Sequence, residues 1–161
     1  MLSMLKRYDV IYCDIDDTIV SGTITNLMHI TWKLFKSIFI SEILQMLQAR
    51  FKLYKPNVKL LYNISNSQVP VVFLTARKKS VWTKMLLEHI CRDFNIEYWA
   101  VAELGTYNPT QDKYDYIQGY IDITDSNCMV IDDNEELLWR CLGNIKMGTI
   151  NPHYVTESVV G

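Results

Sequence analysis

The chain has 161 residues, of which 49% are hydrophobic and 21% charged, with six glycines and four prolines. This length suits one domain with a core of its own, and the composition is typical of a globular protein rather than a disordered one. A formal net charge of -2 argues against a general nucleic-acid binder, which would normally be basic.

Apolar runs alternate with helical patterns along the chain. The runs are rich in β-branched and aromatic residues and predict five strands, at residues 8–13, 69–74, 96–102, 128–131 and 145–150. The helical patterns lie at residues 56–66, 78–94, 110–120 and 134–142. Pro56 is predicted in the first turn of the first of these helices, Thr110 as the cap of the third, and Gly143 as the end of the last. The alternation predicts an α/β fold, a Rossmann-like parallel sheet of about five strands flanked by helices.

Residues 23–55 exceed what a strand–helix–strand unit needs and are predicted to be an insertion. Apolar residues at helical spacing predict that it forms two packed helices: Ile24, Leu27, Met28, Phe35, Ile38 and Phe39, then Ile43, Leu44, Met46 and Leu47. Residues 24–60 carry six basic residues and one acidic residue, so they would attract an anionic substrate or a membrane surface. The alternatives are a solvated polar face and, for the apolar face, a homodimer contact.

The sequence predicts neither secretion nor a transmembrane segment. The most apolar stretch, residues 24–40, is interrupted by His29, Lys33 and Lys36, and the N-terminal residues lack an apolar signal core. Reduced, mostly buried thiols without metal-binding spacing are predicted for the four cysteines, Cys13, Cys91, Cys128 and Cys141. We therefore expect a cytoplasmic protein.

Four of the five predicted strands lead into residues that could carry chemistry, and in parallel sheets ligands bind outside the carboxyl ends of the strands. Asp14 and Asp16 follow the first strand, so that one carboxylate can attack while the other moves protons. Thr75 follows the second strand, where a hydroxyl and backbone amides suit a phosphate oxygen. Lys113, in the first turn of the helix after the third strand, offers a positive charge.

The fourth predicted strand is followed by Asp132 and Asp133. Any one of these aspartates could be a turn or helix-cap residue, but together they point to a shared site. Carboxylates gathered at one sheet edge would repel one another unless a hard divalent cation neutralised them, and oxygen ligands favour magnesium. The pattern therefore predicts a Mg²⁺ site.

Four segments resemble, in order, the four motifs of the haloacid dehalogenase superfamily: VIYCDIDDT, VVFLT, Lys113 in TQDKYDYI, and MVIDD. The resemblance covers the chain outside the insertion. It implies a magnesium-dependent phosphohydrolase, a phosphate monoester phosphatase that forms an aspartyl-phosphate. It also implies a single domain at residues 1–161 with a small helical cap at residues 23–55, and a phosphorylated small molecule or nucleotide as substrate. Asp16 favours a phosphatase, because the dehalogenases of the superfamily lack a carboxylate there.

The resemblance also implies roles for the individual residues. Asp14 would be the nucleophile, and Asp16 the acid that protonates the leaving oxygen and then the base that activates water. Thr75 and Lys113 would bind the phosphoryl group. Arg77 is interpreted as a surface or supporting residue and is not included among the catalytic ones.

The implied magnesium ligands are Asp14, the backbone carbonyl of Asp16, and Asp132, with Asp133 as a further candidate. Asp17 departs from the family pattern, which often has glycine at this position. A turn accepts aspartate, so we expect the substitution to be tolerated.

Two other functions are left open. A receiver-type phosphoacceptor signalling module also combines acidic residues, threonine, lysine and magnesium on a parallel sheet, although it places the phosphorylated aspartate after the third strand. A noncatalytic binding protein would keep the fold and use the apolar insertion as its interaction surface.

Overall fold

A computed structural model describes residues 1–35 and 38–154, with the side chains of residues 32–39 excepted. Five parallel strands form one sheet in the order β5-β4-β1-β6-β7. They are β1 (Val10–Cys13), β4 (Val71–Thr75), β5 (Tyr98–Glu103), β6 (Cys128–Ile131) and β7 (Met147–Ile150). Cys13 at the end of the central strand lies opposite Phe73 of β4 and Ile131 of β6. The predicted α/β fold with a five-stranded parallel sheet is confirmed.

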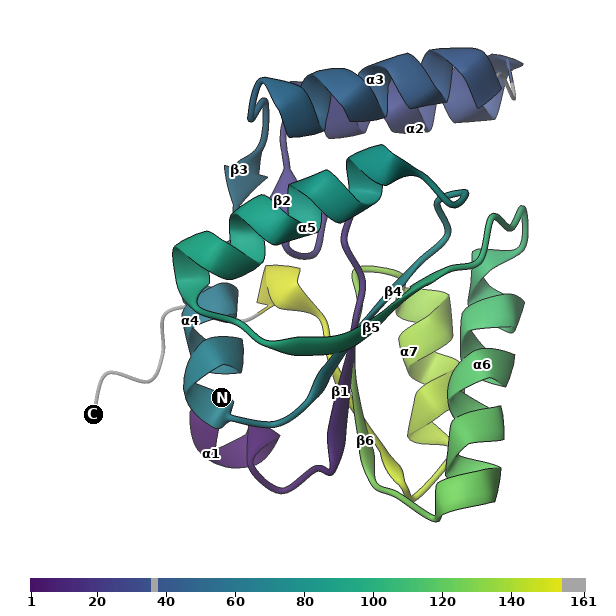
Figure 1. Cartoon of the computed structure of the whole chain (residues 1–161). Helices are drawn as coiled ribbons and strands as arrows, with labels where there is room; N and C mark the ends of the chain where they lie inside the picture. Colours follow the sequence, from purple (N-terminus) through teal and green to yellow (C-terminus); the bar gives the residue numbers. More distant parts are fainter. Residues whose placement is uncertain (36–37, 155–161) are drawn as a thin grey trace.

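Helices cover both faces of this sheet (Figure 1). One face carries α1 (Leu2–Leu5), α4 (Val58–Ser67) and α5 (Val81–Phe94), and the other carries α6 (Pro109–Thr124) and α7 (Glu135–Leu142). Side chains alternate along β1, so Ile11 and Cys13 enter the first core while Val10 and Tyr12 enter the second. All four cysteines are buried and unpaired, as predicted. A 3-10 turn, Pro152–Tyr154, follows β7.

The helix starts differ from their predictions by one to three residues. The largest difference is at α5, which is predicted from residue 78 and begins at Val81. Asn57 caps α4 by accepting a hydrogen bond from the backbone N–H of Leu60 at 3.2 Å, and Pro56 lies outside the helix in the short strand β3. Helix α6 begins at Pro109, whose fixed φ suits a first helical position, so Thr110 is not its cap. Helix α7 ends before Gly143 as predicted.

The chain leaves the sheet after β1 to form the insertion. Strands β2 (Val20–Ser21) and β3 (Lys55–Pro56) pair antiparallel at its base, and α2 (Thr23–Phe35) and α3 (Ile38–Arg50) extend from them. In Figure 1 the two helices lie above the carboxyl ends of the strands, and α3 contacts α5. The predicted two-helix insertion is confirmed. Part of its predicted basic and apolar faces lies outside the described side chains: Lys33, Phe35, Lys36, Ile38 and Phe39.

Within the described parts of the chain, no helix combines the length and apolar character that crossing a bilayer requires.

Candidate active site

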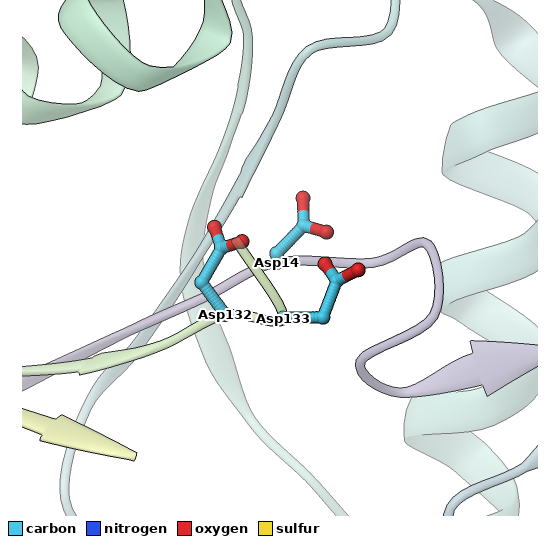
Figure 2. A group of neighbouring side chains, drawn as sticks. All are labelled: Asp14, Asp132 and Asp133. Atoms are coloured by element: carbon cyan, nitrogen blue, oxygen red, sulfur yellow. The ribbon is translucent and has the colours of Figure 1, made fainter. Parts of the chain in front are cut away.

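Three aspartates lie together at the carboxyl edge of the sheet (Figure 2). Asp14 follows β1, and Asp132 and Asp133 follow the adjacent strand β6. One carboxylate oxygen from each lies within 4.8 Å of the other two, with Asp14 and Asp132 buried and Asp133 half-buried. Figure 2 shows the three side chains rising from the strand ends in the same direction. The sequence predicted that these carboxylates would meet, and together they could hold a metal ion.

Lys113 reaches the cluster from α6. Its Nζ donates hydrogen bonds to Oδ1 of Asp14 at 2.8 Å and to Oδ2 of Asp132 at 2.7 Å. The buried positions of α6 are 110, 113, 117 and 121, which is the spacing of one helix face. Lys113 therefore lies on the buried face that packs α6 against the sheet, with its ammonium group at the strand ends. Its side chain is 5% exposed.

The cluster holds more negative charge than Lys113 balances. Burial raises the pKa of Asp14 well above its usual range, and Asp132 raises it further, against the opposing charge of Lys113. Burial and then the carboxylate of Asp132 raise the pKa of Asp133 to about 6. For Lys113, burial lowers the pKa, but the two carboxylates outweigh this effect and raise it overall. One ammonium faces three carboxylates, so the donor set fits a hard divalent cation.

Asp16 lies beside the cluster, and its carboxylate pairs with Arg77. Nε of Arg77 donates to Oδ2 of Asp16 at 2.8 Å, and Nη2 donates to Oδ1 at 2.5 Å. Burial raises the pKa of Asp16, but the guanidinium outweighs burial and lowers the pKa overall. The carboxylate form is therefore favoured, held by a bidentate contact.

Arg77 is the residue that sequence reasoning underestimated. It is 7% exposed, so of the two roles interpreted from the sequence the surface role is wrong, while a supporting role agrees with its contact with Asp16. An arginine after a strand end is usually solvated, and nothing in the local pattern distinguishes a buried one. The partner that buries it, Asp16, is 61 residues away in the sequence.

The turn after β1 depends on Asp17. Its φ of 55° lies in the left-handed region, where aspartate is among the few side chains tolerated besides glycine, and its N–H donates to the carbonyl of Val20 at 2.7 Å. Its carboxylate lies 3.0 Å from Nε2 of His29 on α2. Aspartate is thus accommodated in this turn, and it adds a polar contact between the site loop and the insertion.

Thr75 ends β4, the neighbour of β1 on the side opposite β6. It is buried, and its Oγ1 accepts a hydrogen bond from the N–H of Arg77 at 3.3 Å. Thr75 therefore lies at the same sheet edge as Asp14, as the sequence predicted for it.

A cavity of about 240 Å³ opens beside Asp16, between the insertion and the loop after β4. The insertion lines it with residues that include His29 and Gln45, and the loop lines it with residues that include Lys78 and Lys79. The insertion therefore forms one wall of a hollow next to the carboxylate.

Comparisons of the chain with protein-family models, with curated proteins and with solved structures found no match. The motifs and the geometry of the site carry the functional argument.

Proposed function

We propose that the protein is a magnesium-dependent phosphohydrolase of the haloacid dehalogenase type, which hydrolyses phosphate monoesters through an aspartyl-phosphate on Asp14. The observation that carries this proposal is the contact of Lys113 with both Asp14 and Asp132. These partners are 99 and 19 residues away from the lysine, and both are buried. Such convergence is not expected of independent turn and cap residues.

In the first half-reaction, an oxygen of Asp14 attacks the phosphorus and the bond to the leaving oxygen breaks. Asp16 supplies a proton to that oxygen from its protonated form, which the ion pair with Arg77 makes the minor form. Lys113 binds Oδ1 of Asp14, and the described residues offer no hydrogen bond to Oδ2, so Oδ2 is available for the attack. In the second half-reaction, water attacks the phosphorus and Asp16 accepts its proton. The ion pair with Arg77 favours the carboxylate that this second step needs.

The remaining residues would bind the phosphoryl group and the metal ion. The ammonium of Lys113 has three N–H donors and uses two on carboxylates, which leaves one for a phosphoryl oxygen. The Thr75 hydroxyl accepts from Arg77 and keeps its own hydrogen to donate. Mg²⁺ would be held by the carboxylates of Asp14, Asp132 and Asp133 and by the backbone carbonyl of Asp16. When bound, it would supply positive charge that neutralises the carboxylates and the phosphoryl group.

The cavity beside Asp16 supports a small leaving group. Its volume of about 240 Å³ suits a small molecule or part of a nucleotide, rather than a folded polypeptide. Lys78 and Lys79 line it, and neither forms an ion pair with any described residue. They are available to attract an anionic leaving group.

The test is phosphate release from a panel of sugar phosphates, nucleotides and p-nitrophenyl phosphate, with Mg²⁺ and with a chelator. We expect magnesium-dependent release that Asp14→Asn abolishes while the circular dichroism spectrum is unchanged. Asp9→Asn is the matched control, because Asp9 is exposed and directly precedes β1, at the end of the strand away from Asp14. Silence across the panel would overturn the proposal. A stable phosphoprotein without turnover would then favour signalling, and tight partner binding without phosphorylation would favour a binding protein.

A further inference from the structure

A chain of buried polar side chains joins the insertion to Asp16. Nη2 of Arg77, which donates to Asp16, also donates to Oε1 of Gln48 on α3 at 2.7 Å. Nε2 of Gln48 in turn donates to Oγ1 of Thr25 on α2 at 3.0 Å. Gln48 is 0% exposed and Thr25 is 1% exposed. Both helices of the insertion therefore contribute to the contact that holds Asp16.

This arrangement gives Gln48 a definite task. A fully buried glutamine is costly unless its polar atoms are paired, and here its carbonyl oxygen is paired with Arg77. A long arginine side chain has many rotamers. A second hydrogen-bond partner besides Asp16, here Gln48, therefore restricts the position of the planar guanidinium group. The guanidinium in turn sets the orientation of the Asp16 carboxylate, because Nε and Nη2 of Arg77 each donate to a different oxygen of that carboxylate.

We propose that Arg77 is a positioning residue for Asp16, and that Gln48 makes the insertion part of the active site by fixing Arg77. The inference rests on the proposed function and concerns its second half-reaction. There, the oxygen of water attacks the phosphorus of phosphorylated Asp14 and its proton passes to an oxygen of Asp16. The phosphorus–oxygen bond to Asp14 breaks, its electron pair returns to the Asp14 carboxylate, and inorganic phosphate forms.

Gln48→Met tests the inference, because methionine keeps the length of the side chain and removes the acceptor for Arg77. With p-nitrophenyl phosphate the leaving group needs no proton, so formation of the intermediate does not depend on Asp16 and hydrolysis of the intermediate is slowed. We expect kcat to fall on the order of 10-fold to 100-fold, the cost of a misplaced catalytic group. Because kcat/KM reports the first half-reaction, it should stay within about twofold. A burst of p-nitrophenol should accompany accumulation of the Asp14 phosphate.

Two further variants sharpen the test. Arg77→Lys keeps the charge, loses the planar fork, and should give the same split between kcat and kcat/KM. Thr83→Val is the matched control. Thr83 is buried on α5 and its hydroxyl contacts Gln45 of α3 at 3.5 Å, so the variant loses a buried polar contact to the same insertion helix as Gln48, and this contact does not reach Asp16. Its kinetics should be unchanged.

A second readout is independent of turnover. In metal-free protein, nitrogen-15 NMR should show slow solvent exchange of the Arg77 Nε–H in the wild type and faster exchange in Gln48→Met. Unchanged exchange would overturn the role of Gln48. If Gln48→Met does not fold, Thr25→Val is used instead. It removes the hydroxyl that accepts a hydrogen bond from Nε2 of Gln48, and the same kinetic and exchange measurements apply to it.

The kinetic outcomes separate the inference from the function on which it rests. Equal falls in kcat and kcat/KM, or the absence of a burst, would overturn the positioning role and leave the phosphohydrolase intact. Failure of the wild type to hydrolyse any ester with Mg²⁺ would remove the proposed function and this inference together.

Discussion

Lys113 is expected to hold the metal-free site together. Lys113→Met keeps a long side chain but removes the ammonium that lies 2.8 Å from Asp14 and 2.7 Å from Asp132. Removing one partner of a buried ion pair costs about 3–5 kcal/mol. Here two buried carboxylates lose the same partner and then repel each other, so we expect a loss of about 4–5 kcal/mol in the free energy of unfolding. For a chain of this length, that corresponds to a fall in Tm of about 8–20 °C.

The assay is urea denaturation followed by circular dichroism, in chelator and again with Mg²⁺. A bound divalent cation would replace part of the lost charge, so the destabilisation should shrink in Mg²⁺. Lys84→Met is the control: that side chain is 73% exposed, and its ion pair with Glu88 at 4.0 Å should contribute less than about 1 kcal/mol. A loss below about 1 kcal/mol for Lys113→Met in chelator would refute the reasoning from burial. An equal loss with and without Mg²⁺ would contradict a metal site.

Protons should compete with Mg²⁺ at Asp133, because burial and neighbouring carboxylates raise its pKa to about 6 and only the ionised form is a good ligand. Affinity measured by calorimetry should therefore fall as the pH drops below this value, by up to about tenfold per pH unit, and Asp133→Asn should make the fall shallower. Gly148→Ala should destabilise the fold by about 1–3 kcal/mol in thermal denaturation, since overpacking a core forces shifts. The new methyl group would clash with the phenol ring and Oη of Tyr8. A Tyr8→Ala background should reduce the loss, and equal losses in both backgrounds would contradict the proposed clash.

Much of the fold and of the aspartate cluster could be predicted from local pattern. Buried strands of a parallel sheet are continuous apolar runs, and the helices between them show their own period. Asp14, Asp132 and Lys113 each stand at the boundary of such an element. Because the strands are parallel, their carboxyl ends lie at the same edge of the sheet. Residues that follow different strands, far apart in the sequence, therefore come together there.

Helix starts were predicted less well, because they depend on competition between neighbouring groups. The side chain of Asn57 satisfies the backbone N–H of Leu60, so α4 begins after Pro56 rather than with it. Pro109 begins α6 one residue before Thr110, which was predicted as the cap. The differences at the helix starts are one to three residues, the largest at α5, and they leave Lys113 in the first turns of its helix.

The amino-acid sequence by itself determined the α/β architecture, the insertion and the gathering of carboxylates, because each follows from periodicity and from residues at element boundaries. The tertiary structure alone decided the partners of Arg77. Its contacts with Asp16 and Gln48 span 61 and 29 residues and bring together three different segments. Burial gives these contacts their electrostatic weight, and burial depends on how the insertion packs over the sheet edge, which no local pattern records.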